Sequence, residues 1–421
     1  MFTALTLTDF KSFPHAEMSF GPITTVIGAN AAGKSNLRDA LKFLHAAGRG
    51  MTLPEIFGGK SSVGWPGIRG GAPGTVRNGQ KRFSLTLATK EGLEYTIEIA
   101  VGPKGPTVRK ESLHSGGRIL FGTQPPGPDD AKVLDVRLIA GGDHKKGHKV
   151  VLPAHQPVLS QVTEPALKRT DRNAATLVRC VTEFRNQLAG IRFIDFSPAV
   201  MRQPSVPGEK TISESGDTLS SVLRYLVEDE KKGAVLASWI KVLTPMDVTS
   251  IGFEDYPDGK ILAVLEEPGG RRVPLSSASD GTLRFLGILA SVISPQAPSL
   301  LCFEEIETGL HPVRVQLVSE LLQKHTIDGK PQVLLTTHSP ALLGWLGREH
   351  RGYAYLAYRL PDTADTRLKA FRDIPNLESA LEKTDASRLF ETGWFEEAVF
   401  FAEGQPTPIS FVAEDEPGKQ P

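Results

Sequence analysis

A short segment near the N-terminus has the residue types and spacing needed to bind phosphate. Residues 28–35 read Gly-Ala-Asn-Ala-Ala-Gly-Lys-Ser and follow the pattern GxxxxGK[ST]. Glycines let a backbone wrap around phosphate, and the N–H groups of the loop and of a helix start offer partial positive charge. Lys34 would reach the β- and γ-phosphates, and the Ser35 hydroxyl would hold Mg²⁺. The expected nucleotide contacts are Gly28, Ala29, Asn30, Ala31, Ala32, Gly33, Lys34, Ser35 and Asn36.

The segments on either side place this phosphate loop between a strand and a helix. Residues 23–27, Ile-Thr-Thr-Val-Ile, have the β-branched, apolar composition of a buried strand. After the loop, Leu37, Ala40, Leu41 and Leu44 recur at helical spacing. A glycine turn before an ordinary helix is the alternative, but the strand, the Lys-Ser pair and the helix together favour a nucleotide site. The sequence therefore predicts ATP and Mg²⁺ as ligands.

Two carboxylates follow a second apolar run. Residues 299–303, Ser-Leu-Leu-Cys-Phe, predict a buried strand that ends at Glu304 and Glu305. Because α/β sheets bind ligands at the carboxyl ends of their strands, both acids are expected beside the phosphate loop. Glu304 would bind Mg²⁺ with Ser35, directly or through water, and Glu305 would orient or deprotonate the attacking water. An ordinary exposed strand end is the alternative.

Two further motifs have the chemistry to contact phosphate. A third apolar run, residues 332–337, precedes His338, whose neutral imidazole could hydrogen-bond a γ-phosphate. Upstream, Ser279 and Gly281 lie in a Ser-x-Gly turn at a helix start, where backbone amides and a hydroxyl can bind an anion. A structural histidine and a simple helix cap are the alternatives. The order of the motifs along the chain favours a shared functional site.

In this order, the motifs resemble those of ABC-type ATPases. The residues that carry the resemblance are the phosphate loop, Ser279-Asp280-Gly281-Thr282 (the signature turn), Glu304-Glu305, Gly309-Leu310-His311-Pro312 and Thr337-His338-Ser339. The variant is similar to the branch that contains the RecF, SMC and overcoming-lysogenization-defect (OLD) proteins, commonly described as AAA-type ATPases. The similarity covers roughly residues 1–60 and 270–345.

The resemblance implies an α/β fold: an ABC-type P-loop ATPase head with a mixed core sheet flanked by helices, an antiparallel β-subdomain and an inserted helical lobe. It also implies a head-to-tail homodimer, in which each site joins the phosphate loop of one chain to the signature turn of the other. Ser279 and Gly281 would then contact the partner chain's γ-phosphate. Glu304 would hold Mg²⁺, Glu305 the water, and His338 would act as the switch. Most members carry Asp where this chain has Glu304, so slow hydrolysis is expected.

Three segments are expected along the chain. Residues 1–160 would form the N-terminal part of the ATPase lobe, with the phosphate loop and the β-subdomain. Residues 161–260 would form an inserted, mainly helical lobe. Residues 261–421 would form the C-terminal part, with the signature turn, the acidic strand, the histidine switch and a tail. Within the first segment, residues 125–149 are rich in Gly, Pro and charge and predict a loop.

The tail and a basic run suggest partners. Residues 398–402 predict an apolar strand before Glu403-Gly404, which resembles the opening of a Toprim nuclease domain. The later Asp-x-Asp strand of that module has no counterpart in this sequence, so a nuclease is expected as a separate effector protein. The basic run at residues 144–149 could contact DNA phosphates, although a solvated loop is the simpler interpretation.

Two choices stay open at the level of sequence. Gln156 or Gln161 could supply the glutamine that senses γ-phosphate in this family, and the sequence does not decide between them. Phe10 and Phe13 are candidates for stacking on adenine, but aromatic residues near an N-terminal strand are more often part of a core.

The composition bounds the class of protein. Among 421 residues, 48 Lys and Arg balance 48 Asp and Glu, so no global attraction to nucleic acid is indicated. The two cysteines, Cys180 and Cys302, are far apart and predict buried thiols of a reducing compartment. The N-terminus lacks the features of a signal peptide, and no apolar run approaches the roughly 18 residues of a membrane span. A soluble, cytoplasmic protein without a membrane partner is expected.

Three functions compete at this stage. The leading hypothesis is an ATP-hydrolysing, dimerising switch in DNA repair or antiphage defence that controls a separate nuclease or other effector, with DNA as a further candidate partner. The first alternative is the ATP-binding subunit of a membrane transporter. It is weakened by the long segment before the signature turn and by the absence of Ser-Gly-Gly-Gln. The second alternative is an ATP-dependent scaffold with little hydrolysis.

Overall fold

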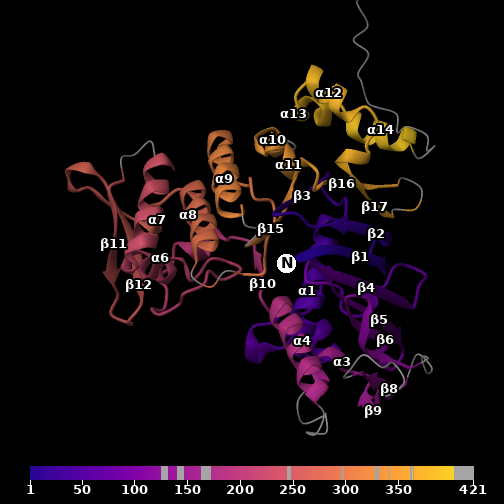
Figure 1. Ribbon diagram of the computed structural model, residues 1–421. Helices are drawn as coiled ribbons and strands as arrows, with labels where there is room; N and C mark the ends of the chain where they lie inside the picture. Colours follow the sequence, from indigo (N-terminus) through magenta and orange to yellow (C-terminus); the bar gives the residue numbers. More distant parts are fainter. Residues whose placement is uncertain are drawn as a thin grey trace, which may run out of the picture.

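A six-stranded sheet with the order β10-β14-β15-β3-β16-β17 forms the core of the computed structural model (Figure 1). Its first five strands are parallel, and β17 is antiparallel to β16. The strands span Ile23–Ile27 (β3), Ile191–Ile194 (β10), Leu300–Phe303 (β14), Gln332–Thr337 (β15), Ala354–Arg359 (β16) and Thr366–Ala370 (β17). The structure describes residues 1–124, 131–139, 147–162, 172–243, 248–294, 296, 298–327, 331–339, 341–360, 363 and 365–402.

The core strands are buried on both faces, which explains their continuous apolar sequences. Along β14, Leu300 and Cys302 pack into one hydrophobic cluster, and Leu301 and Phe303 pack into another. Parallel pairing of β14 with β15, and of β15 with β3, brings the carboxyl ends of these three strands to one edge. The predicted mixed α/β core flanked by helices is confirmed.

A second, antiparallel sheet of eight strands packs against one side of the core through α1 (Lys34–Gly48) and α4 (Arg172–Ala189). Its order is β2-β1-β4-β5-β6-β7-β8-β9, and it lies at the right of Figure 1. The strands are Phe2–Phe10 (β1), Phe13–Ser19 (β2), Arg82–Thr89 (β4), Leu93–Gly102 (β5), Gly105–Ser115 (β6), Arg118–Thr123 (β7), Val133–Leu138 (β8) and His148–Pro153 (β9). The prediction of a loop over residues 125–149 is therefore wrong for β8 and the start of β9. The regular alternation in β8 was outweighed by the glycines, prolines and charges around it.

The other side of the core carries helices and a small sheet, at the left of Figure 1. One hydrophobic cluster joins the core strands to strand β12 (Ile261–Glu266) and to the helices α6 (Leu219–Glu228), α7 (Glu230–Leu243), α8 (Asp280–Ile293) and α9 (Pro312–His325). The small sheet consists of Ser250–Asp255 (β11), Ile261–Glu266 (β12) and Arg272–Pro274 (β13). Within the predicted insert over residues 161–260, α4 packs against α1 and β10 belongs to the core sheet. The division of the chain at residues 160 and 260 stays a prediction.

The helices cover both faces of the core sheet and its β16–β17 edge. They span Lys34–Gly48 (α1), Leu53–Gly58 (α2), Val158–Gln161 (α3), Arg172–Ala189 (α4), Pro198–Met201 (α5), Leu219–Glu228 (α6), Glu230–Leu243 (α7), Asp280–Ile293 (α8), Pro312–His325 (α9), Ala341–Trp345 (α10), Arg348–Arg351 (α11), Leu377–Lys383 (α12), Ala386–Glu391 (α13) and Trp394–Ala402 (α14). In the part of the chain that the structure describes, no helix has both the length and the apolar character required to cross a membrane.

The C-terminal helices correct one prediction. Residues 398–402 belong to α14 and are not a strand. In α14, Phe395 and Val399 are buried four residues apart, so their spacing fits a helix that packs on β16. Glu403 and Gly404 lie outside the described residues. The described part of the tail therefore does not have the strand that the comparison with Toprim domains required.

Candidate nucleotide site

The phosphate loop joins the carboxyl end of β3 to the start of α1, as its sequence predicts. The backbone turns through left-handed conformations at Ala31 (φ 62°) and Gly33 (φ 102°). Glycine is required at Gly33 for two reasons. Its left-handed φ is unfavourable for a residue with a side chain, and a β-carbon there would lie 2.4 Å from the Thr366 hydroxyl. At Gly28, a β-carbon would lie 2.3 Å from the carbonyl oxygen of Ala357. The two glycines of the motif therefore permit the close packing of the loop on its neighbours.

Lys34 lies inside the loop with its ammonium group enclosed. Its Nζ donates to the carbonyl oxygens of Gly28 (2.6 Å) and Ala29 (2.9 Å) and lies 3.1 Å from Nδ1 of His338. Burial lowers the pKa of Lys34, while the nearby carboxylates of Glu305, Glu307 and Glu304 oppose that shift. The three acids thus help to keep a buried cation charged at the place where phosphate is expected.

The first turns of α1 are tied to the turn between β1 and β2. Asn36 donates from Nδ2 to the Ser12 hydroxyl (2.7 Å), and that hydroxyl lies 2.6 Å from the hydroxyl of Thr366 on β17. On the next turn, Asp39 accepts from Nζ of Lys11 at 2.6 Å, and both side chains are buried. These contacts fix the helix start relative to both sheets.

Ser35 and Glu304 come together as the sequence predicts. The Ser35 hydroxyl donates to Glu304 Oε1 at 2.6 Å, although the two residues are far apart in sequence. The other carboxylate oxygen, Oε2, accepts from the guanidinium of Arg38. A hydroxyl and a carboxylate are the hard oxygen donors that Mg²⁺ prefers, so this pair fits the ion that the fold family implies.

Glu305 and His338 form the second half of the site. His338 Nε2 lies 2.6 Å from Glu305 Oε1, so this nitrogen carries the hydrogen and donates to the carboxylate. The hydrogen bond from His338 is the main reason why the pKa of Glu305 is lowered. Glu305 also has a left-handed backbone (φ 48°), which is a strained conformation for a residue with a side chain. The site therefore holds an ionised carboxylate in a fixed position.

Nδ1 of the His338 ring faces the phosphate loop. It lies 3.1 Å from Nζ of Lys34 and 3.2 Å from the carbonyl oxygen of Gly28. An ammonium group can only donate, so the contact between Lys34 and His338 is a hydrogen bond from Nζ to Nδ1. A continuous chain of hydrogen bonds then runs from Lys34 through His338 to Glu305.

Two residues of the site were missed from the sequence. Glu307 accepts from the backbone N–H of His338 at 2.7 Å, and Arg38 binds Glu304. Glu307 comes two residues after Glu305, and Arg38 lies three residues after Ser35, on the same helix face. Helical spacing from Ser35 was therefore a usable signal for Arg38.

The signature turn lies at the start of α8. Ser279 is the N-cap, and its hydroxyl accepts from the N–H of Thr282 at 3.2 Å. A β-carbon on Gly281 would lie 2.8 Å from the carbonyl oxygen of Gly309 and 2.9 Å from Nη1 of Arg314. The turn thus packs against the segment that follows Glu305. Ser279 is exposed, and no hydrogen bond or ion pair that the structure describes joins it or Gly281 to residues 28–36.

Gln156 and Gln161 lie away from the phosphate loop. The carbonyl oxygen of His155 accepts from the N–H of Leu53, which follows the C-terminal end of α1. The loop precedes the other end of this 15-residue helix, about 20 Å away at 1.5 Å per residue. This position argues against contact of either glutamine with the phosphate site of its own chain, and the choice of sensor stays open.

The aromatic candidates are also unavailable. Phe10 and Phe13 are fully buried in the core, where Phe10 packs edge-on against Phe83. Of the basic run at residues 144–149, residues 144–146 lie outside the described residues, and His148 and Lys149 begin β9. Of the two cysteines, Cys302 is buried, as predicted, and Cys180 is half-buried.

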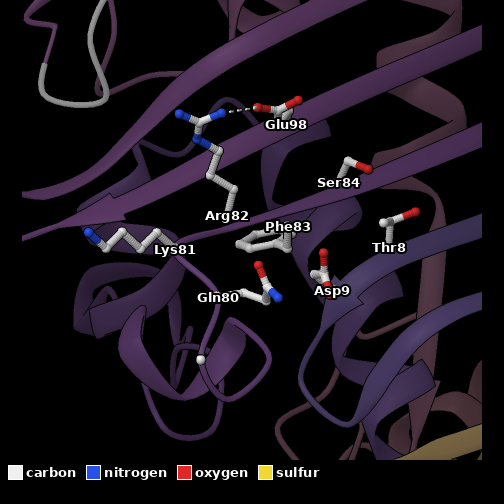
Figure 2. A pocket seen from close by; sticks show the side chains of 9 residues that line it. Thr8, Asp9, Gln80, Lys81, Arg82, Phe83, Ser84 and Glu98 are labelled. Atoms are coloured by element: carbon white, nitrogen blue, oxygen red, sulfur yellow. Dashed lines mark ion pairs between the residues drawn. The ribbon is translucent and has the colours of Figure 1, made fainter.

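A separate cavity of about 480 Å³ lies where the end of β1 meets the start of β4. Figure 2 shows Asp9, Gln80 and Phe83 around it, with the guanidinium of Arg82 directed toward Glu98 at 4.0 Å. The described residues that line it include none of the phosphate-loop, acidic-strand or signature residues. This cavity is therefore distinct from the cluster around Lys34.

A comparison with known protein families finds one that matches most of the chain. A sequence profile of the family described as "AAA domain, putative AbiEii toxin, Type IV TA system" matches residues 23–344. That span runs from β3 into α10 and contains the phosphate loop, the signature turn, Glu304, Glu305 and His338.

Solved structures of SMC heads are similar to this chain. An SMC head bound to the C-winged helix domain of ScpA matches with a TM-score of 0.50 at 13% identity, over 87% of this chain and 97% of that chain. The SMC head domain from Thermotoga maritima matches at 14% identity with a TM-score of 0.43, over 88% and 98% of the two chains. An Smc head with an extended coiled coil, bound to the C-terminal domain of ScpA from Pyrococcus furiosus, matches at 15% identity with a TM-score of 0.44, over 91% and 98%. The first match confirms the predicted ATPase-head fold.

Proposed function

The chain belongs to this family of AAA domains, and from that premise we propose that it binds and hydrolyses ATP at residues 28–36. Lys34 would leave the loop carbonyls for the β- and γ-phosphates, and the N-terminus of α1 would face the phosphates. Ser35 and Glu304 would hold Mg²⁺. When bound, Mg²⁺ would neutralise charge on the phosphate oxygens.

The hydrogen-bonded chain from Lys34 through His338 to Glu305 carries the proposal. Its contacts of 3.1 and 2.6 Å link the cation expected on phosphate to the carboxylate expected on water. Arrival of a γ-phosphate would draw Lys34 away from Nδ1 of His338. Glu305 would then accept a proton from water at its carboxylate, while His338 Nε2 holds that carboxylate in place.

We propose that a complete site requires two chains in head-to-tail contact. Ser279 is exposed at the start of α8, and no described hydrogen bond or ion pair links it to its own phosphate loop. Ser279 and Gly281 would contact the γ-phosphate held by the partner chain. Two ATP molecules would then lie between the chains, and hydrolysis would release the dimer.

We further propose that this dimer is a switch in antiphage defence or DNA repair, acting on a separate nuclease or other effector. The family description, which names a toxin of a type IV toxin–antitoxin system, supports a defence role. Among the described residues, no group of three or more His, Cys, Asp or Glu side chains could hold a metal ion. The nuclease in this proposal is a separate protein. DNA is a second candidate partner, and a cytoplasmic location is part of the proposal.

An ATP-dependent scaffold with little hydrolysis is the second candidate. It is favoured by the fact that both carboxylate oxygens of Glu304 already accept hydrogen bonds, from Ser35 and from Arg38. In that case ATP would still join two chains, but phosphate release would be very slow.

Lys34→Ala tests the proposal directly. Removal of the ammonium leaves no other cation inside the loop, so ATP binding measured by calorimetry should fall below detection, and Mg²⁺-dependent phosphate release should stop. Arg224→Gln, a substitution in an ion-paired arginine on α6, is the control and should change neither quantity. Equal ATP affinity of wild type and Lys34→Ala would contradict the assignment of the site. Binding without phosphate release in the wild type would favour the scaffold.

A further inference from the structure

Arg38 is surrounded by three carboxylates at the carboxyl edge of the core sheet. Its Nη1 donates to Glu304 and lies 3.7 Å from Asp195, and its Nη2 donates to Glu214. Lys42, one turn further along α1, also binds Glu214 at 2.8 Å. We call these five residues the Arg38 cluster. The motifs that predict the nucleotide site contain only Glu304 of the cluster.

Arg38 is held inside this cluster. Its side chain is 13% exposed, and its Nε is buried without a hydrogen-bond partner. Asp195 and Glu214 are 58% and 43% exposed, so water can solvate them when they are unpaired. The guanidinium is a planar fork that can bind two carboxylates at once. The guanidinium of Arg38 therefore has acceptors on two sides, Glu304 on one and Glu214 with Asp195 on the other.

The carboxylate of Glu304 links the expected metal position to Arg38. Its Oε1 accepts from Ser35, and its Oε2 accepts from Arg38, which lies three residues further along α1. A cation that binds both oxygens of Glu304 would therefore have to displace Arg38.

The acceptors on the other side of Arg38 belong to one paired segment. The N–H of Asp195 donates to the carbonyl oxygen of Glu214 at 2.8 Å, and the N–H of Ser197 donates to that of Ser215 at 3.0 Å. Asp195 follows β10, which is the neighbour of β14 in the core sheet. Glu214 and Asp195 are therefore positioned by the same sheet edge as Glu304.

We propose that Arg38 is a positioning residue: its Nη1 holds Oε2 of Glu304 until Mg²⁺ and nucleotide are loaded and then turns to Asp195, while its Nη2 stays on Glu214. The proposal rests on the proposed nucleotide site. Arg38 competes for one oxygen of Glu304, so it raises the Mg²⁺ concentration that nucleotide binding requires. Glu214 acts in the opposite direction because it keeps Arg38 paired after Glu304 is released.

Two substitutions should therefore shift the Mg²⁺ requirement in opposite directions. Binding of a fluorescent ATP analogue is titrated with Mg²⁺, and the half-saturating Mg²⁺ concentration is compared. For Arg38→Gln it should fall about tenfold, equivalent to about 1.4 kcal/mol. For Glu214→Gln it should rise severalfold. Arg224→Gln, an arginine also paired with two carboxylates but located on α6, is the matched control and should leave the value unchanged.

Binding of the same analogue in EDTA separates this role from a structural one. All four proteins should bind equally without metal, because Arg38 acts on Glu304 and not on phosphate. An Arg38 that only stabilised the fold would lower the melting temperature and leave the Mg²⁺ requirement unchanged. If Arg38→Gln does not fold, Arg38→Lys keeps the charge but loses the fork, and its half-saturating Mg²⁺ concentration should fall by a smaller factor.

The possible results separate a failure of the role of Arg38 from a failure of the proposed nucleotide site. Normal nucleotide binding with the same Mg²⁺ requirement in Arg38→Gln, Arg38→Lys and Glu214→Gln would overturn the role of Arg38 alone. Shifts in the same direction for Arg38→Gln and Glu214→Gln would overturn it as well. A wild-type chain that binds no ATP analogue at any Mg²⁺ concentration would instead refute the proposed function.

Discussion

Glu305→Gln separates the basicity of the carboxylate from its shape. Glutamine keeps a carbonyl oxygen that can accept from Nε2 of His338, as Glu305 does at 2.6 Å. It loses the charge that lets Glu305 take a proton from water. A general base contributes about 10²–10⁴ in rate, which is about 2.7–5.4 kcal/mol of barrier at 1.36 kcal/mol per decade. We therefore expect kcat for ATP to fall at least a hundredfold.

Nucleotide binding and stability should change little in the same variant. Lys34 keeps its place in the loop, so the ATP affinity should stay within about threefold. The side chain of Glu305 is 42% exposed, so solvent screens its pairing with His338. The cost in unfolding free energy should stay below about 1 kcal/mol.

The assay combines steady-state phosphate release with calorimetric ATP binding and a urea unfolding curve. Glu320→Gln, on the exposed side of α9, is the matched control and should behave as the wild type. Hydrolysis by Glu305→Gln within threefold of the wild-type rate would refute the assignment of Glu305 as the base. Loss of ATP binding would show that the carboxylate is needed for the structure of the site.

Three further predictions address the signature turn and a buried acid. Ser279→Arg should bind ATP but hydrolyse it poorly, and mixing it with Lys34→Ala should restore part of the ATPase rate if one intact site can act alone. Full activity of Ser279→Arg by itself would place the site within one chain. Gly281→Ala should lose about 1–3 kcal/mol of stability in urea, because its β-carbon would meet a carbonyl oxygen at 2.8 Å. Gly344→Ala, where the same atom meets nothing within 4 Å, should lose none. Burial raises the pKa of Glu111 from 4.5 to about 7, so the folded chain binds this proton more tightly than the unfolded chain. Stability should therefore fall as pH rises from about 4.5 to 7, by at most about 1.4 kcal/mol per pH unit, and Glu111→Gln should remove that slope in urea titrations at several pH values.

The parts of the site that follow strands were predictable because their physics is local. An apolar run that ends in a polar group predicts a buried strand with that group at its carboxyl end. The structure accordingly joins Lys34, His338 and Glu305 by hydrogen bonds, and it pairs Ser35 with Glu304. Arg38 was less accessible, because its partners Glu304 and Glu214 come from distant segments that only the folded sheet edge brings together.

The failures have equally specific causes. Strand β8 alternates buried and exposed residues over only six positions, and the glycines and prolines around it concealed that pattern. In α14, a run of apolar residues fits a strand or a buried helix equally well, and only its packing on β16 decides. The choice between Gln156 and Gln161 stays open because it rests on residue type alone, and type carries no information about which end of α1 they approach.

The mass of Glu305→Gln with and without ATP tests whether ATP joins two chains through the phosphate loop of one and the signature turn of the other. Without nucleotide, light scattering should give the monomer mass of 45.6 kDa. With saturating ATP and Mg²⁺, the mass should double, and the added substitution Ser279→Arg should prevent that increase. A monomer mass at an ATP concentration where calorimetry shows full occupancy would contradict the account.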